Sequence, residues 1–377
     1  MGESSTSNNN SIIKTPEFSE ALFTTRTVIF DFKNDIDLIA IAKTLPLEMI
    51  HFSKPWKRNT KPKLKEFPPL GTIFSIRMIN LIRGVFGVYF KNSLMVDMSL
   101  GTKSVNVKIS KHTIHICGIK ETKHGEYVAN TLVNYISKCN DTLILIEKYQ
   151  KEIHNLFEWI KQGKQGDLVT RETFIIERTK IKDKHKLKKK VTGEETLPKY
   201  IPFNVDEAFA NFNNIPVELI LFFSKRFSEC QTYTDMMKDL DYFNTNFNKR
   251  CILDNTPSPI VFQQKVQNVM VNCSYSFGFP IKKSELTRLI NETQSEFIAS
   301  YNKVSDHSVN VFLLSSEKER EDFGDRDQTV AHTFIVYESS YCMMSSKFMS
   351  GMKDAFYKFR DLIEQLRPNI IDTSKTT

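Results

Sequence analysis

The same order of secondary-structure elements is predicted at both ends of the 377-residue chain. In each region a strand is followed by a helix, several short antiparallel strands and a second helix. A duplicated unit of this size constrains the fold more than any single motif, because each unit must bury one apolar face of its sheet. The length suits two such domains with an insertion between them. We therefore expect an α+β fold built from two repeats.

The first copy begins with a segment rich in β-branched and aromatic residues, which is typical of a strand. Asn34 and Asp35 then precede apolar residues at helical spacing, so we expect a helix with an Asx cap that ends at Pro46. The expected elements are a strand over 25–33, this helix, a strand over 71–78, a hairpin of 105–110 and 113–119, and a helix over 124–139.

The second copy repeats this order near the C-terminus, although residue identity between the copies is low. Its final helix carries apolar residues along one side. The expected elements are a strand over 268–277, a helix over 280–292, a strand over 309–314, a hairpin of 332–337 and 341–344, and a helix over 351–366.

The region between the copies differs from both. Residues 141–164 have strong helical periodicity, and 203–248 are mixed but mostly helical. We therefore divide the chain into a disordered tail over 1–20, a first repeat over 21–140, a mostly helical insertion over 141–262 and a second repeat over 263–372.

A strongly basic run, RTKIKDKHKLKKK, occupies residues 178–190 within the insertion. Three interpretations are open: an arm that binds DNA, a nuclear import signal, or a solvated and mobile loop. We favour the loop, because runs of like charge repel one another and are usually solvated.

The composition limits the function without choosing one. Lys plus Arg number 52 and Asp plus Glu 44, and the net charge of +8 permits attraction to a polyanion without establishing it. No apolar segment approaches the ~20 residues that a membrane span needs. The six cysteines show no CxxC pair and no zinc-ligand spacing, which favours reduced thiols in an intracellular setting.

Signatures of enzymes and cofactor sites are missing from the sequence. The chain has no G-x-x-x-x-G-K-[ST], G-x-S-x-G or H-E-x-x-H motif and no glycine-rich fingerprint, so we expect neither catalysis nor a cofactor. His112 and His115 lie two positions apart on one face of the predicted hairpin. Because no third ligand is apparent, a hairpin pair is favoured over a metal site.

Several short motifs resemble the TATA-binding protein family. In the second copy, 267–271 (QNVMV) resembles the family's first strand with its QN pair, 279–281 (FPI) resembles the turn into its first helix, and Ser300-Tyr301 resembles the SY after that helix. In the first copy, 114–120 (IHICGIK) resembles the strand that the family ends in TGAK. The resemblance spans about 25–139 and 265–371 and is more specific in the second copy. Divergent members of the family occur in large DNA viruses.

This resemblance implies a pseudo-symmetric saddle, in which a curved antiparallel sheet binds the minor groove of duplex DNA and helices cover the convex side. It places the wedge residues, which part the bases at each end of the site, near Leu70, Ile109, Asp306 and Tyr337. Asp306 does not suit this role, because a carboxylate repels phosphates. His307 and Val309 are the alternatives at that position.

The other contacts that the family implies fall on strand residues. Of two asparagines at the centre of the site only Asn268 is retained, since the second position falls near Thr25. Apolar groove-facing residues map to Met270 and Met343, and the small hydroxyl residue that precedes the family's hairpin glycine maps to Cys117 in the first copy and Ser345 in the second.

A sheet that lies on the minor groove needs small or apolar side chains on its strands, because the groove offers few hydrogen-bonding groups, and cations at its rim for the phosphates. Val105, Val107 and Ile109 alternate with polar residues and fit the first requirement. The candidate rim cations are Arg77, Lys108, Lys111 and Lys120.

Each candidate also has an ordinary structural interpretation, and the sequence leaves both open. Asn268 fits a strand edge, and Cys117 fits a small buried position. Leu70, Ile109 and Tyr337 fit an apolar core.

The resemblance implies transcription initiation. The protein would bind AT-rich promoter DNA as a monomer and present helices such as 124–139 and 351–366 to RNA polymerase or general transcription factors. The protein would be located inside the cell, and if it is viral it would act in the host nucleus or in a cytoplasmic viral factory. The alternative is a saddle-shaped interaction platform of the transcription apparatus that has lost specific DNA binding. A nuclease-like or glycosylase-like enzyme is a weaker idea, because no catalytic residue can be named.

Overall fold

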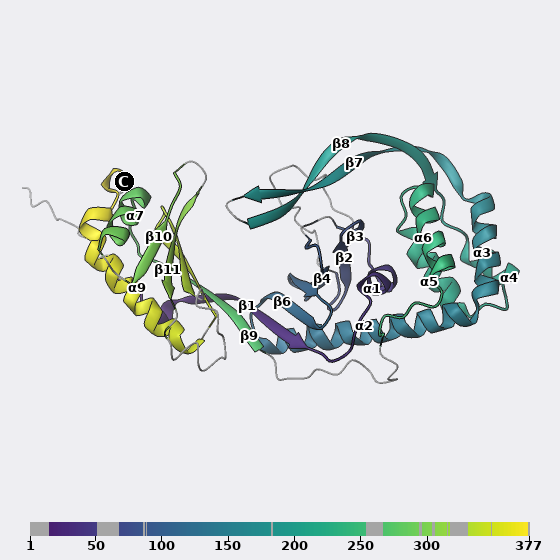
Figure 1. Cartoon of the computed structure of the whole chain (residues 1–377), viewed down its shortest axis with the longest axis horizontal. Coiled ribbons are helices and arrows are strands. Elements are labelled where there is room, and N and C mark those ends of the chain that lie inside the picture. Colours follow the sequence, from purple (N-terminus) through teal and green to yellow (C-terminus); the bar gives the residue numbers. More distant parts are fainter. Residues whose placement is uncertain are drawn as a thin grey trace, which may run out of the picture. The chain divides into compact units, whose positions relative to one another are not determined.

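The chain forms two compact units. The computed structural model describes residues 15–50, 68–85, 87, 89–181, 184–253, 267–293, 296–303, 306–314, 316, 331–347 and 349–375. Unit 1 comprises 1–28, 118–122 and 267–377, and unit 2 comprises 29–117 and 123–266. Figure 1 shows both, coloured along the sequence.

Unit 1 is a block of strands with helices on one face. Its strands neighbour one another in the order β10-β11-β12-β13-β9-β1, and the four pairs from β10 to β9 are antiparallel. The elements are η1 (Phe18–Glu20), most of β1 (Leu22–Asp31), β9 (Gln267–Ser276), α7 (Lys283–Glu292), β10 (Phe297–Ser300), β11 (Ser308–Leu314), β12 (Ala331–Tyr337), β13 (Tyr341–Ser346), α9 (Met349–Ile370) and η2 (Thr373–Lys375).

Every second strand residue of unit 1 enters one apolar core with α7 and α9. Successive side chains of a strand point to opposite faces, so one face can be buried while the other stays open. Figure 1 shows both helices beside these strands. The strand residues of the core are Val271, Cys273, Tyr275, Val309, Val311, Leu313, Phe334, Val336, Cys342 and Met344, and the helices add Leu286, Ile290, Met352, Phe356, Phe359 and Ile363.

Unit 2 contains a second block of strands and a helical insertion. Its strands neighbour one another in the order β1-β6-β5-β4-β2-β3, with antiparallel pairing from β6 to β3. The elements are the end of β1, α1 (Leu38–Thr44), β2 (Ile73–Met78), β3 (Leu81–Gly84), β4 (Leu94–Ser99), β5 (Ser104–Ile109), β6 (Thr113–Ile119), α2 (Thr122–Lys148), α3 (Gln150–Gly163), β7 (Gln165–Ile181), β8 (Lys184–Tyr200), α4 (Val205–Asn211), α5 (Val217–Ser228) and α6 (Tyr233–Thr245).

The two blocks share one connectivity when β3 is set aside. In each, a strand is followed by a helix, four strands and a long helix, and the first strand neighbours the last one. β1, β2, β4, β5 and β6 correspond in this way to β9, β10, β11, β12 and β13. The structure is thus mixed α+β with large antiparallel strand blocks, in the element order expected from the sequence.

Several boundaries differ from the expectations. The cap of α1 is Asp37, whose side chain accepts from the backbone N–H of Ile39 and Ala40, rather than Asn34 or Asp35. The helix expected to end at 139 continues to Lys148, past the predicted domain boundary at 140. β3, β4 and β10 had no counterpart in the expected elements. They are strands of four to six residues, which carry little periodicity.

The predicted tail over 1–20 is described only from residue 15. The structure corrects its C-terminal end, because Phe18–Glu20 forms a 3₁₀ helix. The Phe18 ring packs edge-on against Phe356 with centroids 5.4 Å apart, so apolar burial fixes this segment. Residues 1–14 lie outside the described part of the chain, as do residues 54–65, where the sequence predicts a basic loop that contains proline.

The insertion contains a long hairpin that the sequence did not suggest. Of the basic run, for which the sequence favours a loop, residues 178–181 belong to β7 and 184–190 to β8, and these strands pair from Gln165↔Tyr200 to Ile181↔Lys184. Pairing of the two strands satisfies their backbone hydrogen bonds. This stabilisation outweighs the repulsion between like charges from which the loop was predicted. Helices α3 to α6 supply an aromatic core around Phe157, Phe223 and Phe243.

No helix in the described part of the chain is long and apolar enough to cross a membrane.

A substitution at Phe359 of α9 tests whether α7 and α9 form one apolar core with the strands of unit 1. Phe359 is fully buried and stacks on Phe334 with ring centroids 4.1 Å apart. We expect Phe359→Ala to lower the unfolding free energy of unit 1 by about 3–5 kcal/mol, because the change leaves a cavity. Hydrogen exchange of peptides from β11 and β12 in increasing urea measures this. Leu22→Ala, at a 67% exposed position, is the control and should change the value by about 0.5 kcal/mol or less. Equal destabilisation of the two variants would contradict this core.

Candidate nucleic-acid interface

On the face of unit 1 that the helices do not cover, none of the strand residues that the structure describes is charged. Register and alternation define this open face of unit 1, because directly paired residues share a face. Its members are Met270, Asn272, Ser274 and Ser276 of β9, Tyr341, Met343 and Ser345 of β13, Thr333, Ile335 and Tyr337 of β12, Ser308, Asn310, Phe312 and Leu314 of β11, and Ile298 and Ser300 of β10.

Large apolar side chains are exposed on this face. Ile298 is 58% exposed, Leu314 57% and Tyr341 42%. The rings of Tyr341 and Tyr337 lie with centroids 5.8 Å apart. Because monomeric proteins rarely expose large apolar patches, this face is a candidate binding surface.

Amide and hydroxyl groups lie among these apolar residues. Asn272 Nδ2 donates to Thr25 Oγ1 of β1 over 2.8 Å. The Oδ1 atom of Asn272 is buried and has no hydrogen-bond partner among the described residues. The Oγ atoms of Ser276 and Ser340 are 2.7 Å apart. The face therefore offers short-range hydrogen bonds without placing a charge in the surface.

The structure brings together four of the residues proposed from the sequence. Met270, Tyr337, Met343 and Ser345 all lie on the open face of unit 1, and Met270 is 38% exposed. Asn268 belongs to the same alternate set of β9 positions. Sequence reasoning missed Asn272. The pattern that could have identified it is its position two residues after Met270, which places both residues on the same face of β9.

The corresponding open face of unit 2 is charged. It carries Asp31, Asp97, Lys108 and His115 on neighbouring strands, together with Arg77. The pKa of His115 is lowered, first by burial and then by the positive charge of Lys108. Cys117 and Lys108, both proposed as contacts, lie half-buried on this face.

An ion pair and a hydrogen bond link three neighbouring strands on this face. Arg77 Nη1 donates to Asp97 Oδ2 over 2.7 Å, and Asn106 Nδ2 donates to Asp97 Oδ1 over 2.8 Å. Arg77 is only 4% exposed, which corrects its proposed role as a rim cation for phosphates. Buried charges are retained only when paired, so Asp97 accounts for the position of Arg77.

Ile109 lies on the helix side of β5 rather than on the open face. It is fully buried, as is Val107, and Val105 is nearly so, which corrects the groove-facing role proposed for all three. The alternation was recognised, but it does not say which side the helices cover. Leu70 is 54% exposed just before β2. Asp306 accepts from the backbone N–H of Asn302 over 2.9 Å.

Part of the chain after β3 lies over the outer strands of this charged face. A Cβ atom on Gly87 would lie 2.2 Å from Arg77 Nη1, so a side chain at this position would displace the Arg77 guanidinium. Tyr89 is 2% exposed, and Lys108 Nζ lies 5.2 Å from the centroid of the Phe90 ring. Unit 2 thus covers the outer part of its own open face.

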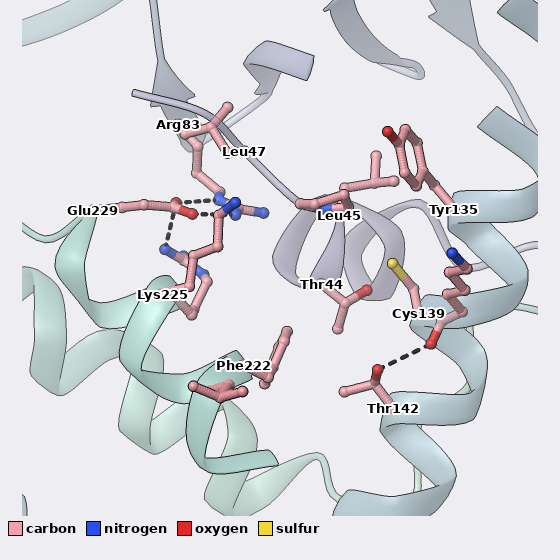
Figure 2. A pocket seen from close by; sticks show the side chains of 14 residues that line it. Thr44, Leu45, Leu47, Arg83, Tyr135, Cys139, Thr142, Phe222, Lys225 and Glu229 are labelled. Atoms are coloured by element: carbon pink, nitrogen blue, oxygen red, sulfur yellow. Dashed lines mark hydrogen bonds and ion pairs between the residues drawn. The ribbon is translucent and has the colours of Figure 1, made fainter. Parts of the chain in front are cut away.

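A cavity of about 370 Å³ in unit 2 lies among α1, α2 and α5 (Figure 2). Its apolar lining includes Leu45, Leu47 and Phe222, while Tyr135 and Lys138 come from α2. We assign it no catalytic chemistry, and the described residues contain no cluster of three metal-ligating side chains.

A buried ionic network borders this cavity. Arg83 of β3 donates twice to Glu229, with both distances 2.7 Å, as Figure 2 shows. Arg226 donates to Glu229 over 2.9 Å and contacts Asp239 at 2.5 Å. Burial lowers the pKa of Arg226, and the Arg83 charge adds to that effect. Asp239 also accepts from Lys43 over 2.6 Å, so the network joins α1 and β3 to the insertion.

Comparisons with known proteins assign no family. No protein-family model matches the sequence. No curated protein is significantly similar to it. Among solved structures, the chain is similar to Methanococcus jannaschii TBP, with a TM-score of 0.35 and 8% identity, over 92% of this chain and 98% of that one. A likeness this distant shows neither membership of that family nor a function.

The Arg83–Glu229 pair gives a stability prediction. We expect Glu229→Gln to lower the unfolding free energy of unit 2 by about 3–5 kcal/mol, because two buried guanidinium groups lose their shared carboxylate. Urea titration followed by Trp159 fluorescence measures this. The control is Lys225→Gln, which removes an exposed ion pair with Glu48 and should cost about 0–1 kcal/mol. A Glu229→Gln variant as stable as the control would argue against the network.

Thiol reactivity tests the placement of the cysteines. All six are free, and burial raises the pKa of Cys139 to about 11 and those of Cys273 and Cys342 to about 12. We expect iodoacetamide at pH 8 to label half-buried Cys117 well before these three, because the thiolate is the reactive form. Mass spectrometry of quenched samples measures the order, and urea-unfolded protein should lose it. Labelling of Cys273 as fast as Cys117 would contradict the burial of Cys273.

Proposed function

We propose that this protein is a non-enzymatic, TATA-binding-protein-like initiation factor whose unit 1 lies with its open face on the minor groove of duplex DNA. The observation that carries the proposal is the open face itself, which combines exposed apolar side chains with hydroxyl and amide groups and whose described strand residues are all uncharged. The proposal includes a saddle formed by the two strand blocks.

The chemistry of the minor groove suits this face. A·T pairs present only acceptors there, and G·C pairs add one amino donor, so the groove offers little to charged side chains. Ser345, Thr333 and Asn272 supply small donors, and Met343 and Ile335 supply apolar contact. An acidic residue here would be repelled by the flanking phosphates, so the lack of Asp and Glu on these strands matters.

Sequence and topology support the same proposal. The QN pair at Gln267-Asn268 begins β9, and the FPI motif lies between β9 and α7, as the family resemblance requires. The two strand blocks share one connectivity. AT-rich promoter DNA is the proposed ligand, and RNA polymerase or general transcription factors are the proposed partners of α2 and α9. The proposed setting is intracellular, with the protein acting as a monomer; a viral source is a hypothesis from the resemblance.

A specific observation favours a second candidate, the interaction platform without specific DNA binding. The open face of unit 2 carries the Arg77–Asp97 pair and is partly covered at Gly87. A sheet that needs both halves to grip DNA would be impaired by such a face.

Binding of short duplexes separates these candidates. We expect the full-length protein to bind an A·T-rich 30-base-pair duplex more tightly than a G·C-rich one in low salt. Met343→Glu should weaken binding by at least about tenfold, equivalent to about 1.4 kcal/mol, because it places a carboxylate among the phosphates. The charge-matched control is Ser284→Glu, at an exposed position of α7. Fluorescence anisotropy measures both.

Two results would overturn the DNA proposal. One is that the wild-type protein binds neither duplex at low salt. The other is that Met343→Glu and Ser284→Glu weaken binding equally, since the effect would then reflect net charge. Capture of purified RNA polymerase subunits by a protein that ignores both duplexes would support the platform.

A further inference from the structure

β7 and β8 form a long two-stranded ribbon in unit 2. Each strand has 17 residues, and the two pair only with each other as a sheet among the described residues. At about 3.4 Å per residue the ribbon is on the order of 55 Å long. Figure 1 shows it extending away from α3 and α6. Neither strand of the ribbon joins the sheet that contains β2 to β6. The ribbon therefore does not extend that sheet, and we consider a separate function for it.

The register of the ribbon places four lysines on one face. Lys184, Lys186, Lys188 and Lys190 occupy alternate positions of β8 and therefore share a face. Their direct partners on β7 are Ile181, Thr179, Glu177 and Ile175. Successive lysines are about 6.8 Å apart along the strand, and the row spans roughly 20 Å. We call these four residues the lysine row.

Charge is divided along the length of the ribbon. The far half carries the lysine row on one face and Arg178, Lys180 and Lys189 on the other. The near half instead pairs Glu172 with Glu194 and Arg171 with Glu195. The basic residues are thus concentrated in the half of the ribbon that lies away from its anchored end.

The near end of the ribbon is anchored. Arg171 donates twice to the carboxylate of Asp235 in α6, over 2.7 and 2.6 Å. Lys199 forms a backbone bridge to Thr232, and Tyr200 is only 1% exposed. The helices therefore hold one end of the ribbon, while the basic end lies many residues away along both strands.

We infer that the far half of β7–β8 is a second nucleic-acid contact, which binds the sugar-phosphate backbone of duplex DNA through the lysine row. Each step of the row equals about two base pairs of helical rise at ~3.4 Å each, so successive lysines can meet every second phosphate of one strand. A two-stranded β-ribbon also fits the major groove of B-DNA. Such contacts add affinity and position the protein without reading sequence. This contact does not depend on the open face of unit 1.

The test replaces the lysine row in the full-length protein with glutamine. The variant is Lys184→Gln, Lys186→Gln, Lys188→Gln and Lys190→Gln together. The matched control removes the same charge from exposed helical lysines: Lys148→Gln, Lys151→Gln, Lys238→Gln and Lys353→Gln. Fluorescence anisotropy with a 30-base-pair duplex of mixed sequence is measured over a series of salt concentrations. The same proteins are tested on a single-stranded RNA of equal length.

We expect the lysine-row variant to reduce the slope of log K against log salt by about 0.9 for each phosphate that a lysine no longer neutralises, up to about 3.6. The control should change the slope much less. The ratio of A·T-rich to G·C-rich binding should stay the same in the row variant, because backbone contacts weaken all sequences alike. Replacing the four lysines with arginine should keep the wild-type slope, which shows that charge rather than folding is responsible.

Three outcomes would overturn this inference. The first is an unchanged slope in the row variant, and the second is an equal change in the control. The third is a wild-type preference for single-stranded RNA that the row variant abolishes, since the ribbon would then be an RNA contact. Failure of the minor-groove proposal appears instead as an A·T preference that is absent or does not depend on Met343, so the two failures are distinguishable.

Discussion

One-sided burial of a strand block governs the rest of this structure. In unit 1, α7 and α9 take the side chains of Val271, Val311 and Phe334 into one core, and the intervening residues of the same strands are left on the other face. Because side chains alternate along a strand, the position of the helices fixes the composition that the opposite face can have. The candidate interface is therefore a consequence of the core.

The two strand blocks share a connectivity and differ in what their open faces can do. In unit 1 the described strand residues of that face are apolar or polar but uncharged, whereas in unit 2 the face contains the Arg77–Asp97 pair and is approached by Gly87. Unit 2 also carries the insertion, which the Arg83–Glu229 pair fastens to β3. In the proposed function, unit 1 reads the ligand and unit 2 supports the ribbon and its proposed contact with the DNA backbone.

Particular residues show where sequence reasoning reached the site and where it stopped. The family resemblance selected Met270, Tyr337, Met343 and Ser345, and in the structure these residues lie on three strands and share one face. The alternation around Ile109 was equally clear, yet it belongs to the core, because alternation defines two faces without saying which one the helices cover.

The sequence by itself determined most of the local elements, namely the longer strands and the helices of both blocks and their order, because periodicity and capping are properties of neighbouring residues. It did not reveal the short strands β3, β4 and β10. Only the tertiary structure decided which strand face is open, that Arg77 meets Asp97 rather than a phosphate, and that the basic run pairs as a ribbon. These outcomes depend on residues far apart in the chain. Their burial and pairing are set by packing, which no local pattern encodes.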